Sequence, residues 1–210
     1  MTTPPASLPF RPARLIPLVA LPALLTSSPV ALAVDGTITI NGEIIDSTCK
    51  INNQTPPSNL IVNLPKISTS ALKAKGDFAG ATLFTLKLTD CPSTLNGEVK
   101  AYFEPGSTTD YDNGALYAYT STAAVTSAAG SIPTGLTKVA NVSIQLTNPD
   151  GTPIVIGASS NTAAGDELRN GESSTKTATL RYLARYLKSG DGNISSGKLV
   201  TYVQYSIVYP

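Results

Sequence analysis

Few side chains in this sequence could carry out catalysis or bind a metal. The 210 residues include no His, no Trp, one Met and two Cys, Cys49 and Cys91. Without His, neither a Ser-His-Asp nor a Cys-His catalytic arrangement is possible, and the usual zinc sites are excluded as well. No nucleophile motif compensates, which disfavours a secreted hydrolase. We therefore expect a protein that is not an enzyme and that holds no metal and no cofactor.

Two groups of carboxylates remain as candidates for a metal site or an acid–base pair. The run Asp110-Tyr111-Asp112-Asn113-Gly114 superficially resembles a calcium loop, but its spacing is wrong and it lacks the closing bidentate ligand. We interpret it as a solvated turn centred on Asn113-Gly114. Asp166 and Glu167, near Arg169, indicate a second surface loop. A glycosidase needs two carboxylates facing each other across a cleft, and nothing in the sequence indicates such a pair.

The first 33 residues predict a secretory signal peptide. Arg11 and Arg14 supply a positive region, Leu15 to Leu25 is apolar, and a small-x-small motif ends at Ala33. The apolar run has 11 residues and is interrupted by Pro, whereas a membrane span needs about 20. We expect cleavage between Ala33 and Val34, so that an exported chain of one domain remains.

The mature chain is nearly neutral. Without the two Arg of the signal it carries 13 basic and 14 acidic residues. It has no basic arm or stripe, so nucleic acid is not an expected partner, and its weak self-repulsion suits self-association. An even number of Cys in an exported protein favours a disulfide between Cys49 and Cys91, and two buried free thiols are the alternative.

Short strands separated by turns dominate the predicted fold. Helical patterns are rare: residues 68–75 fit one or two helical turns, and residues 177–188 fit either a helix or a strand. For the latter we favour the strand, with Arg181 and Arg185 facing out, because Thr and Tyr are better strand formers. Short strands separated by turns over one domain predict a single antiparallel β-sandwich. Its predicted strands and apolar runs are 37–45, 60–64, 82–88, 99–103, 139–146, 154–156 and 199–209, with a turn at 148–151.

The two ends of the mature chain have the most distinctive patterns. The N-terminal segment alternates before the first Cys, and its apolar face consists of Ile38, Ile40, Gly42 and Ile44. It is either a first strand of the chain's own sheet or an extension that pairs elsewhere. The C-terminal strand alternates through Val203, Tyr205, Ile207 and the penultimate Tyr209, and Gly197 is fourteenth from the end.

These end features, with the spacing of the two Cys, resemble the chaperone–usher pilins. The matching residues run in order across the mature chain: Ile38, Ile40, Gly42, Ile44, Cys49, Cys91, Gly197 and Tyr209. Internal stretches further resemble the major serotype fimbrial subunits of Bordetella, whereas residues 117–176 resemble them less clearly. Those stretches are residues 62–68, 101–106, 109–111 and 206–210.

The resemblance implies an all-β, incomplete immunoglobulin-like antiparallel sandwich that a donor strand from a neighbouring subunit completes. It implies a signal peptide at 1–33, a donor-strand extension at 34–46 and a pilin domain at 47–210. The extension would donate Ile38, Ile40, Gly42 and Ile44. The groove wall and chaperone contact would be formed by Gly197, Val203, Tyr205, Ile207 and Tyr209.

The implied function is that of a major structural subunit of a surface fimbria that supports adhesion to host cells. Its partners would be further copies of itself, a periplasmic chaperone, an outer-membrane usher and a tip adhesin, reached by export through the periplasm. A sugar-binding adhesin or a minor tip or adaptor subunit is the alternative. A two-domain adhesin is disfavoured because Cys49 follows Val34 by only 15 residues, which leaves no room for a receptor-binding domain.

Overall fold

The computed structural model describes residues 37–45 and 48–210. The predicted signal peptide and its cleavage site between Ala33 and Val34 lie outside these residues. The chain divides into two units, Met1–Glu43 and Ile44–Pro210, and every strand of the described residues belongs to the second. The described residues contain one helix, the short 3-10 turn η1 at Thr69–Ala71, and no helix long and apolar enough to cross a membrane.

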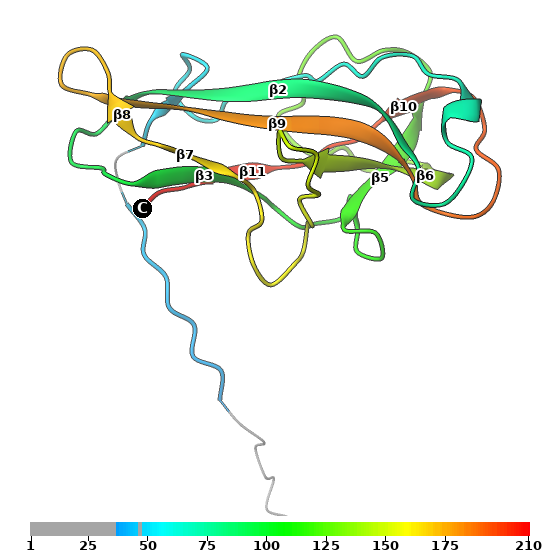
Figure 1. The fold of residues 1–210 in the computed structure, drawn as a ribbon, viewed down its shortest axis with the longest axis horizontal. Coiled ribbons are helices and arrows are strands. Elements are labelled where there is room, and N and C mark those ends of the chain that lie inside the picture. Colours follow the sequence, from blue (N-terminus) through cyan, green and yellow to red (C-terminus); the bar gives the residue numbers. More distant parts are fainter. Residues whose placement is uncertain (1–36, 46–47) are drawn as a thin grey trace, which may run out of the picture. The chain divides into compact units, whose positions relative to one another are not determined.

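The second unit is all-β and antiparallel, with two sheets (Figure 1). The larger sheet has the order β1-β2-β9-β6-β5-β10, with β4 beside β5 and β8 beside β9. Its strands are β1 Lys50–Ile51, β2 Phe78–Cys91, β4 Thr109–Asp110, β5 Ala115–Ser121, β6 Lys138–Thr147, β8 Arg169–Asn170, β9 Lys176–Lys188 and β10 Lys198–Val200. The smaller sheet has the order β11-β3-β7, with β3 Glu98–Phe103, β7 Gly165–Glu167 and β11 Tyr205–Val208.

Strands β2 and β9 form the long central pair of the larger sheet. Leu86 lies opposite Leu180, and the pairing shifts register near Gly80. Gly80 has a φ of +68°, and a Cβ there would lie 3.0 Å from the Tyr186 ring, so both backbone and space favour Gly. The strand interpretation of residues 177–188 is confirmed, since β9 covers this stretch.

Arg181 and Arg185 have different environments, although both were expected to face out. Arg181 is exposed, but only 7% of Arg185 is accessible. The Arg185 guanidinium donates to Gln145 Oε1 at 2.9 and 2.7 Å and lies over the Phe78 ring. Its burial lowers the pKa of the guanidinium. The prediction that Arg185 faces solvent is therefore wrong. The Gln145 amide on β6 and the Phe78 ring on β2 cover its guanidinium.

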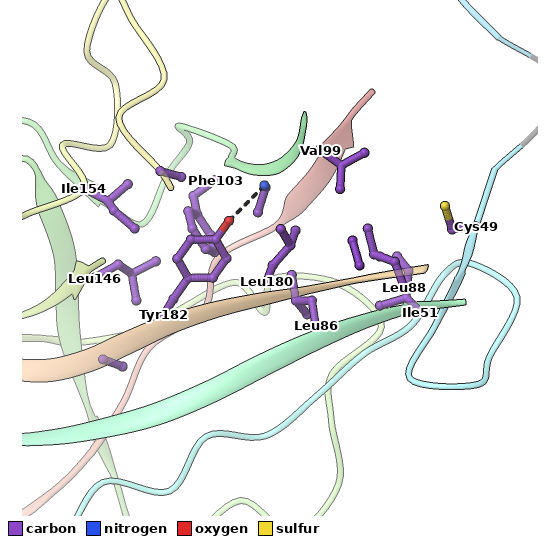
Figure 2. Close-up of a cluster of buried hydrophobic side chains, with 14 of the residues drawn as sticks. Cys49, Ile51, Leu86, Leu88, Val99, Phe103, Leu146, Ile154, Leu180 and Tyr182 are labelled. Carbon is purple, nitrogen blue, oxygen red and sulfur yellow. Dashed lines mark hydrogen bonds between the residues drawn. The ribbon is translucent and has the colours of Figure 1, made fainter. Parts of the chain in front are cut away.

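The core lies between the two sheets and is centred on Tyr182 of β9 (Figure 2). The Tyr182 ring packs edge-on against Phe103, with centroids 5.2 Å apart, and tilted against Phe84 at 5.8 Å. Its hydroxyl accepts the Ala101 N–H at 3.0 Å and donates to the Ala164 carbonyl at 2.8 Å. Tyr182 thus packs in the apolar core while its hydroxyl pairs two backbone groups that burial would otherwise leave without partners.

Several predicted elements are confirmed. Residues 82–88, 99–103 and 139–146 lie in β2, β3 and β6, and η1 provides the helical turn within residues 68–75. The turn at 148–151 is closed by the Gly151 N–H, which donates to the Asn148 carbonyl.

Two expectations are wrong. The single C-terminal strand is divided into β10 and β11, which pair with β5 and β3 in different sheets. Asp166 and Glu167 lie in β7 instead of a loop. The apolar runs at 60–64 and 154–156 form no strand, and residues 37–45 form none within the chain's own sheets.

The turn at Asp110–Gly114 is present, but Asp110 is not solvated. The Asn113 N–H donates to the Asp110 carbonyl at 3.2 Å. The Asp110 side chain is 3% exposed, and its carboxylate accepts from Ser143 Oγ at 2.6 Å and from Asn113 Nδ2 at 2.9 Å. The carboxylate therefore joins the turn to β6, a partner far away in the sequence.

Replacing Tyr182 by Phe should lower the free energy of unfolding by about 1–3 kcal/mol, because a buried N–H and a carbonyl lose their partner. Guanidinium unfolding would measure the change. Tyr111→Phe is a matched control, since Tyr111 is 63% exposed. Equal losses for the two variants would contradict a role for the Tyr182 hydroxyl.

Candidate functional site

The N-terminal segment presents large apolar side chains that the described residues leave uncovered. Ile38 and Ile40 are each 88% exposed and Ile44 is 99% exposed. Residues 37–45 form neither helix nor strand, so this segment is not a first strand of the chain's own sheets. Single exposed apolar residues are common, but three Ile on one face of a short segment, with Gly42 between the second and the third, form an exposed apolar row that is typical of a binding surface.

The C-terminal segment forms a second alternating set, which we call the C-terminal row. Its members are half-buried and pack against the core, whereas the residues between them are exposed. Strand β11, which carries much of the row, is at the edge of its sheet: its neighbour is β3, and the other side has no strand among the described residues. The row consists of Val203, Tyr205, Ile207 and Tyr209.

A third set, the 60–64 row, consists of Leu60, Val62 and Leu64. These side chains are half-buried against the same core, while Ile61 and Asn63 between them are exposed. The alternation is that of a strand. Yet no backbone–backbone hydrogen bond within the described residues involves residues 57–67. The segment thus has the side-chain pattern of a strand without the ladder that normally pairs its backbone.

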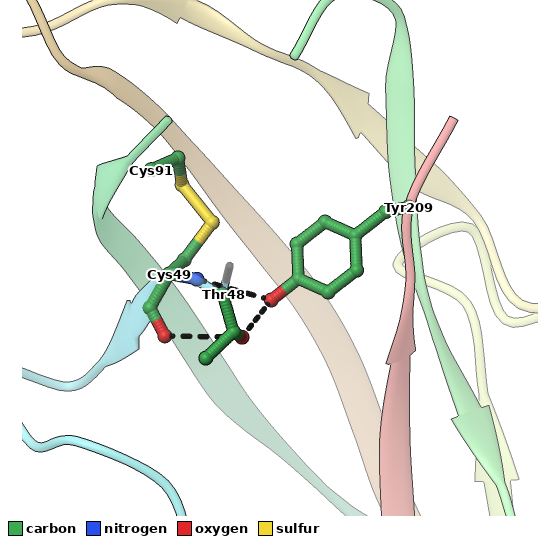
Figure 3. The surroundings of a disulfide bond; sticks show 4 residues. All are labelled: Thr48, Cys49, Cys91 and Tyr209. Carbon is green, nitrogen blue, oxygen red and sulfur yellow. Dashed lines mark hydrogen bonds between the residues drawn. A yellow bond between two sulfur atoms is a disulfide. The ribbon is translucent and has the colours of Figure 1, made fainter. Parts of the chain in front are cut away.

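Two Tyr hydroxyls join the C-terminal row to the segment that leads into the 60–64 row. Tyr205 Oη donates to the Ser58 carbonyl at 2.7 Å, and Ser58 is buried. Tyr209 Oη accepts the Cys49 N–H at 3.2 Å and shares a hydrogen bond with the Thr48 hydroxyl (Figure 3). Burial raises the pKa of Tyr205, so its hydroxyl stays protonated and can donate at neutral pH.

The disulfide lies at the Tyr209 end of this arrangement. Cys49 and Cys91 are bonded, and both are fully buried. The bond connects the residue that precedes β1 to the last residue of β2 (Figure 3). It therefore holds in place the backbone N–H that Tyr209 binds.

The remaining predicted site residue, Gly197, is set apart from these contacts. It precedes β10, and a Cβ there would meet no atom within 4 Å. Sequence reasoning missed the 60–64 row, Ser58 and Thr48 as parts of the site. The alternation at 60, 62 and 64 was the available signal, but it was treated only as an apolar run.

The described residues offer little for catalysis. No group of three or more His, Cys, Asp or Glu among them could hold a metal ion. Two shallow surface cavities, of about 370 and 460 Å³, contain none of the predicted site residues. The first is lined in part by Asp110, Tyr117 and Lys138, and the second by residues around Lys176. The chemistry supported by the site is non-covalent: exposed backbone edges and alternating apolar side chains.

Comparison with known families identifies the family of this chain. The family FimA, described as type-1 fimbrial protein, A, matches residues 64–210. The chain belongs to this fimbrial family. The family consists of structural fimbrial subunits, which are not enzymes.

Relatives of this fimbrial protein cover nearly its whole length. It is 45% identical over 194 residues to the serotype 2 fimbrial subunit of Bordetella pertussis, covering 90% of this chain and 93% of the relative. It is 43% identical to the serotype 3 subunit of the same organism, with coverage of 89% and 94%. The F17 fimbrial protein of Escherichia coli is 35% identical, with coverage of 87% and 92%. The expected resemblance to the Bordetella serotype subunits is confirmed.

Solved structures confirm the fold class. A subunit structure of a chaperone–usher pilus superposes with a TM-score of 0.52 at 18% identity, covering 87% of the fimbrial chain and all of the other. The P pilus rod subunit PapA superposes with a TM-score of 0.52 at 16% identity, covering 78% and 100%. The shared fold is immunoglobulin-like and antiparallel.

Removing the disulfide with the double substitution Cys49→Ala and Cys91→Ala should lower the free energy of unfolding by about 4 kcal/mol, given the sequence separation of 42 residues. Guanidinium unfolding with and without reductant would test this. The reduced native chain should approach the variant, and reductant should leave the variant unchanged. An unchanged midpoint for both would contradict a stabilising disulfide.

Proposed function

We propose that this fimbrial protein is the major structural subunit of a surface fimbria, polymerised by donor-strand exchange through the chaperone–usher pathway. One observation carries the proposal. The C-terminal row and the 60–64 row pack against the same core and are half-buried; β11 has a strand neighbour on one side only, and the 60–64 segment makes no backbone–backbone hydrogen bond within the described residues. A single added strand between them would pair both backbones and cover both rows. We call the space between the rows the acceptor groove.

The N-terminal extension of a second copy has the properties that such a strand needs. Its residues are extended in pattern and unpaired, with Ile38, Ile40 and Ile44 exposed. Strand addition gains affinity from backbone hydrogen bonds and specificity from alternate side chains. Burying the three Ile would contribute about 5–9 kcal/mol before ordering costs are subtracted, at about 1.5–3 kcal/mol each.

An open acceptor groove explains why further partners are needed. Unpaired edges with apolar rows are templates for uncontrolled pairing. A periplasmic chaperone would cover the groove during export, and an outer-membrane usher would exchange the chaperone for the next extension. A tip adhesin would occupy the end of the fibre, which would support adhesion to host cells. The serotype subunits and the pilus structures described above support this route.

The proposed contact makes a polymer and not a closed oligomer. Each copy uses its extension as donor and its groove as acceptor, so the two surfaces of the contact differ. Such head-to-tail contacts continue indefinitely unless the rotation between copies closes a ring. The function requires no catalysis, and we propose that the protein is not an enzyme. After removal of residues 1–33, the extension at 34–46 would act as the donor strand, and the pilin domain at 47–210 would carry the acceptor groove.

Deleting residues 34–44 should give a subunit that accepts a donor strand but supplies none. The deletion removes the exposed Ile residues and leaves all strands of the described fold in place. Cells expressing this variant alone should show no fibres by electron microscopy, while a synthetic peptide of residues 34–46 should still bind the purified variant. Polymerisation of the variant would contradict the donor assignment.

Grafting residues 34–44 after Pro210 through a flexible linker should raise the Tm and give a stable monomer, because the graft can fill the chain's own groove. The matched control is the same graft with Ile38, Ile40 and Ile44 changed to Ser. The control should melt like the ungrafted chain. If the native graft also melts no higher than the ungrafted chain, the proposed missing strand is wrong.

A further inference from the structure

Asn-Gly pairs are the places where a protein backbone most readily attacks one of its own side chains. The sequence contains four of them, at residues 41–42, 96–97, 113–114 and 170–171. In the reaction, the backbone nitrogen of the Gly attacks the side-chain carbonyl carbon of the Asn. Gly favours it, because no Cβ obstructs the approach and its backbone adopts conformations that other residues avoid. Which pair reacts depends on how freely its two residues move.

Local contacts restrain two of these pairs. The Asn113 side-chain amide donates to the Asp110 carboxylate at 2.9 Å, and Gly114 is buried. The Gly171 nitrogen, which would have to attack in its pair, donates its N–H to the Thr175 carbonyl at 2.8 Å. Each pair would therefore have to break a hydrogen bond before it could react.

The pair that begins at Asn96 is restrained at the side chain. Asn96 Nδ2 donates to the Thr94 carbonyl at 3.0 Å, and its Oδ1 accepts from Lys176 Nζ at 3.1 Å. Both polar atoms of the amide are thus bound, so the side chain does not turn freely towards the backbone nitrogen that follows it.

The pair Asn41-Gly42 has none of these restraints. Both residues are exposed and belong to no helix or strand, and none of the backbone–backbone hydrogen bonds of the described residues involves them. A Cβ on Gly42 would meet no atom within 4 Å, so there is also open space around the attacking nitrogen. Of the four pairs, this one is the least protected.

We propose that Asn41 is a site of spontaneous deamidation in a subunit whose extension is still unpaired. This inference rests on the proposed function. The Gly42 nitrogen bonds to Asn41 Cγ and gives up its proton, and the side-chain nitrogen leaves as ammonia. Water then opens the resulting cyclic imide at either of its carbonyls, which gives Asp or isoaspartate at position 41. No oxidant, metal or enzyme takes part.

Pairing of the extension should stop this reaction. A strand keeps each residue near its extended conformation, and the ladder binds backbone N–H groups. To close the ring, Asn41 has to leave the extended conformation and turn its side chain towards the Gly42 nitrogen. Deamidation is therefore confined to copies whose extension has not entered the groove of another copy.

The two products differ in their effect on the donor strand. Asp leaves the backbone unchanged, and in a strand the side chain at position 41 points away from the face that carries the Ile residues. Isoaspartate adds a methylene to the main chain after position 41. Ile44 then falls out of step with Ile38 and Ile40, so the three no longer share one face. A subunit that carries isoaspartate is thereby removed from assembly.

The grafted chain contains both states of Asn41 in one molecule. With residues 34–44 attached after Pro210, the N-terminal copy of Asn41 is free, and the second copy lies in the filled groove. After incubation at mildly alkaline pH, peptide mapping by mass spectrometry should show deamidation first at the free copy. The grafted copy and the other three Asn-Gly pairs should react more slowly. Asn41→Gln in the N-terminal copy is the matched control and should stay unmodified, because Gln closes a larger ring.

Two results of this experiment would overturn the inference. One is deamidation of the free copy no faster than at the other three Asn-Gly pairs. The other is an equal rate at the free and grafted copies in a chain whose Tm the graft has raised. A graft that does not raise the Tm would instead count against the proposed function, because the second copy would then not be paired.

Synthetic peptides test the consequence for assembly. Peptides of residues 34–46 with Asn, Asp or isoaspartate at position 41 are added to the purified variant that lacks residues 34–44. The Asp and isoaspartate peptides carry the same charge and differ only in the backbone. The Asn and Asp peptides should bind alike, whereas isoaspartate should raise the Kd about tenfold or more, as expected when one Ile is no longer buried. An unchanged Kd for isoaspartate would refute the removal of deamidated subunits, and failure of all three peptides to bind would refute the proposed function.

Discussion

Backbone groups that lack partners along two neighbouring edges are the constraint on which this structure depends. Residues 57–67 have the alternation of a strand and no ladder, and β11 pairs on one side only within the described fold. Buried or half-buried N–H and carbonyl groups are costly when unpaired, so a stable arrangement requires another strand. Residues 37–45 of the same chain expose Ile38, Ile40 and Ile44, and the proposed function assigns this segment to the groove of another copy.

The two edges are held in relation to each other by few contacts. Tyr205 bonds the Ser58 carbonyl, and Tyr209 bonds the backbone at Cys49, whose position the disulfide to Cys91 maintains. Behind them, Tyr182 connects β9 to β3 and so fixes the sheet to which β11 belongs. The C-terminal row is thus joined to Cys49 and Ser58 by two Tyr hydroxyls, and the core behind it keeps β11 in its sheet.

Sequence reasoning was reliable where a segment's environment follows from its own alternation. Strands β2, β3, β6 and β9 were predicted because their apolar residues face one common core. It failed where residues far away in the sequence determine whether a side chain is buried. Gln145 and Phe78 cover Arg185, and Ser143 donates a hydrogen bond to Asp110. The 60–64 row was not recognised as part of the site, because its alternation is short and was read only as an apolar run. The division of the C-terminal strand depends on β5 and β3, which no local pattern identifies.

That division has a mechanical consequence. Residues 198–208 contribute β10 to one sheet and β11 to the other, so one continuous stretch is bonded into both layers. Ladder hydrogen bonds run perpendicular to the strands, and a pull along a strand therefore loads many of them together in shear. Tension applied to a strand lying beside β11 would pass through this stretch into both sheets, which would resist extraction better than a contact confined to one edge.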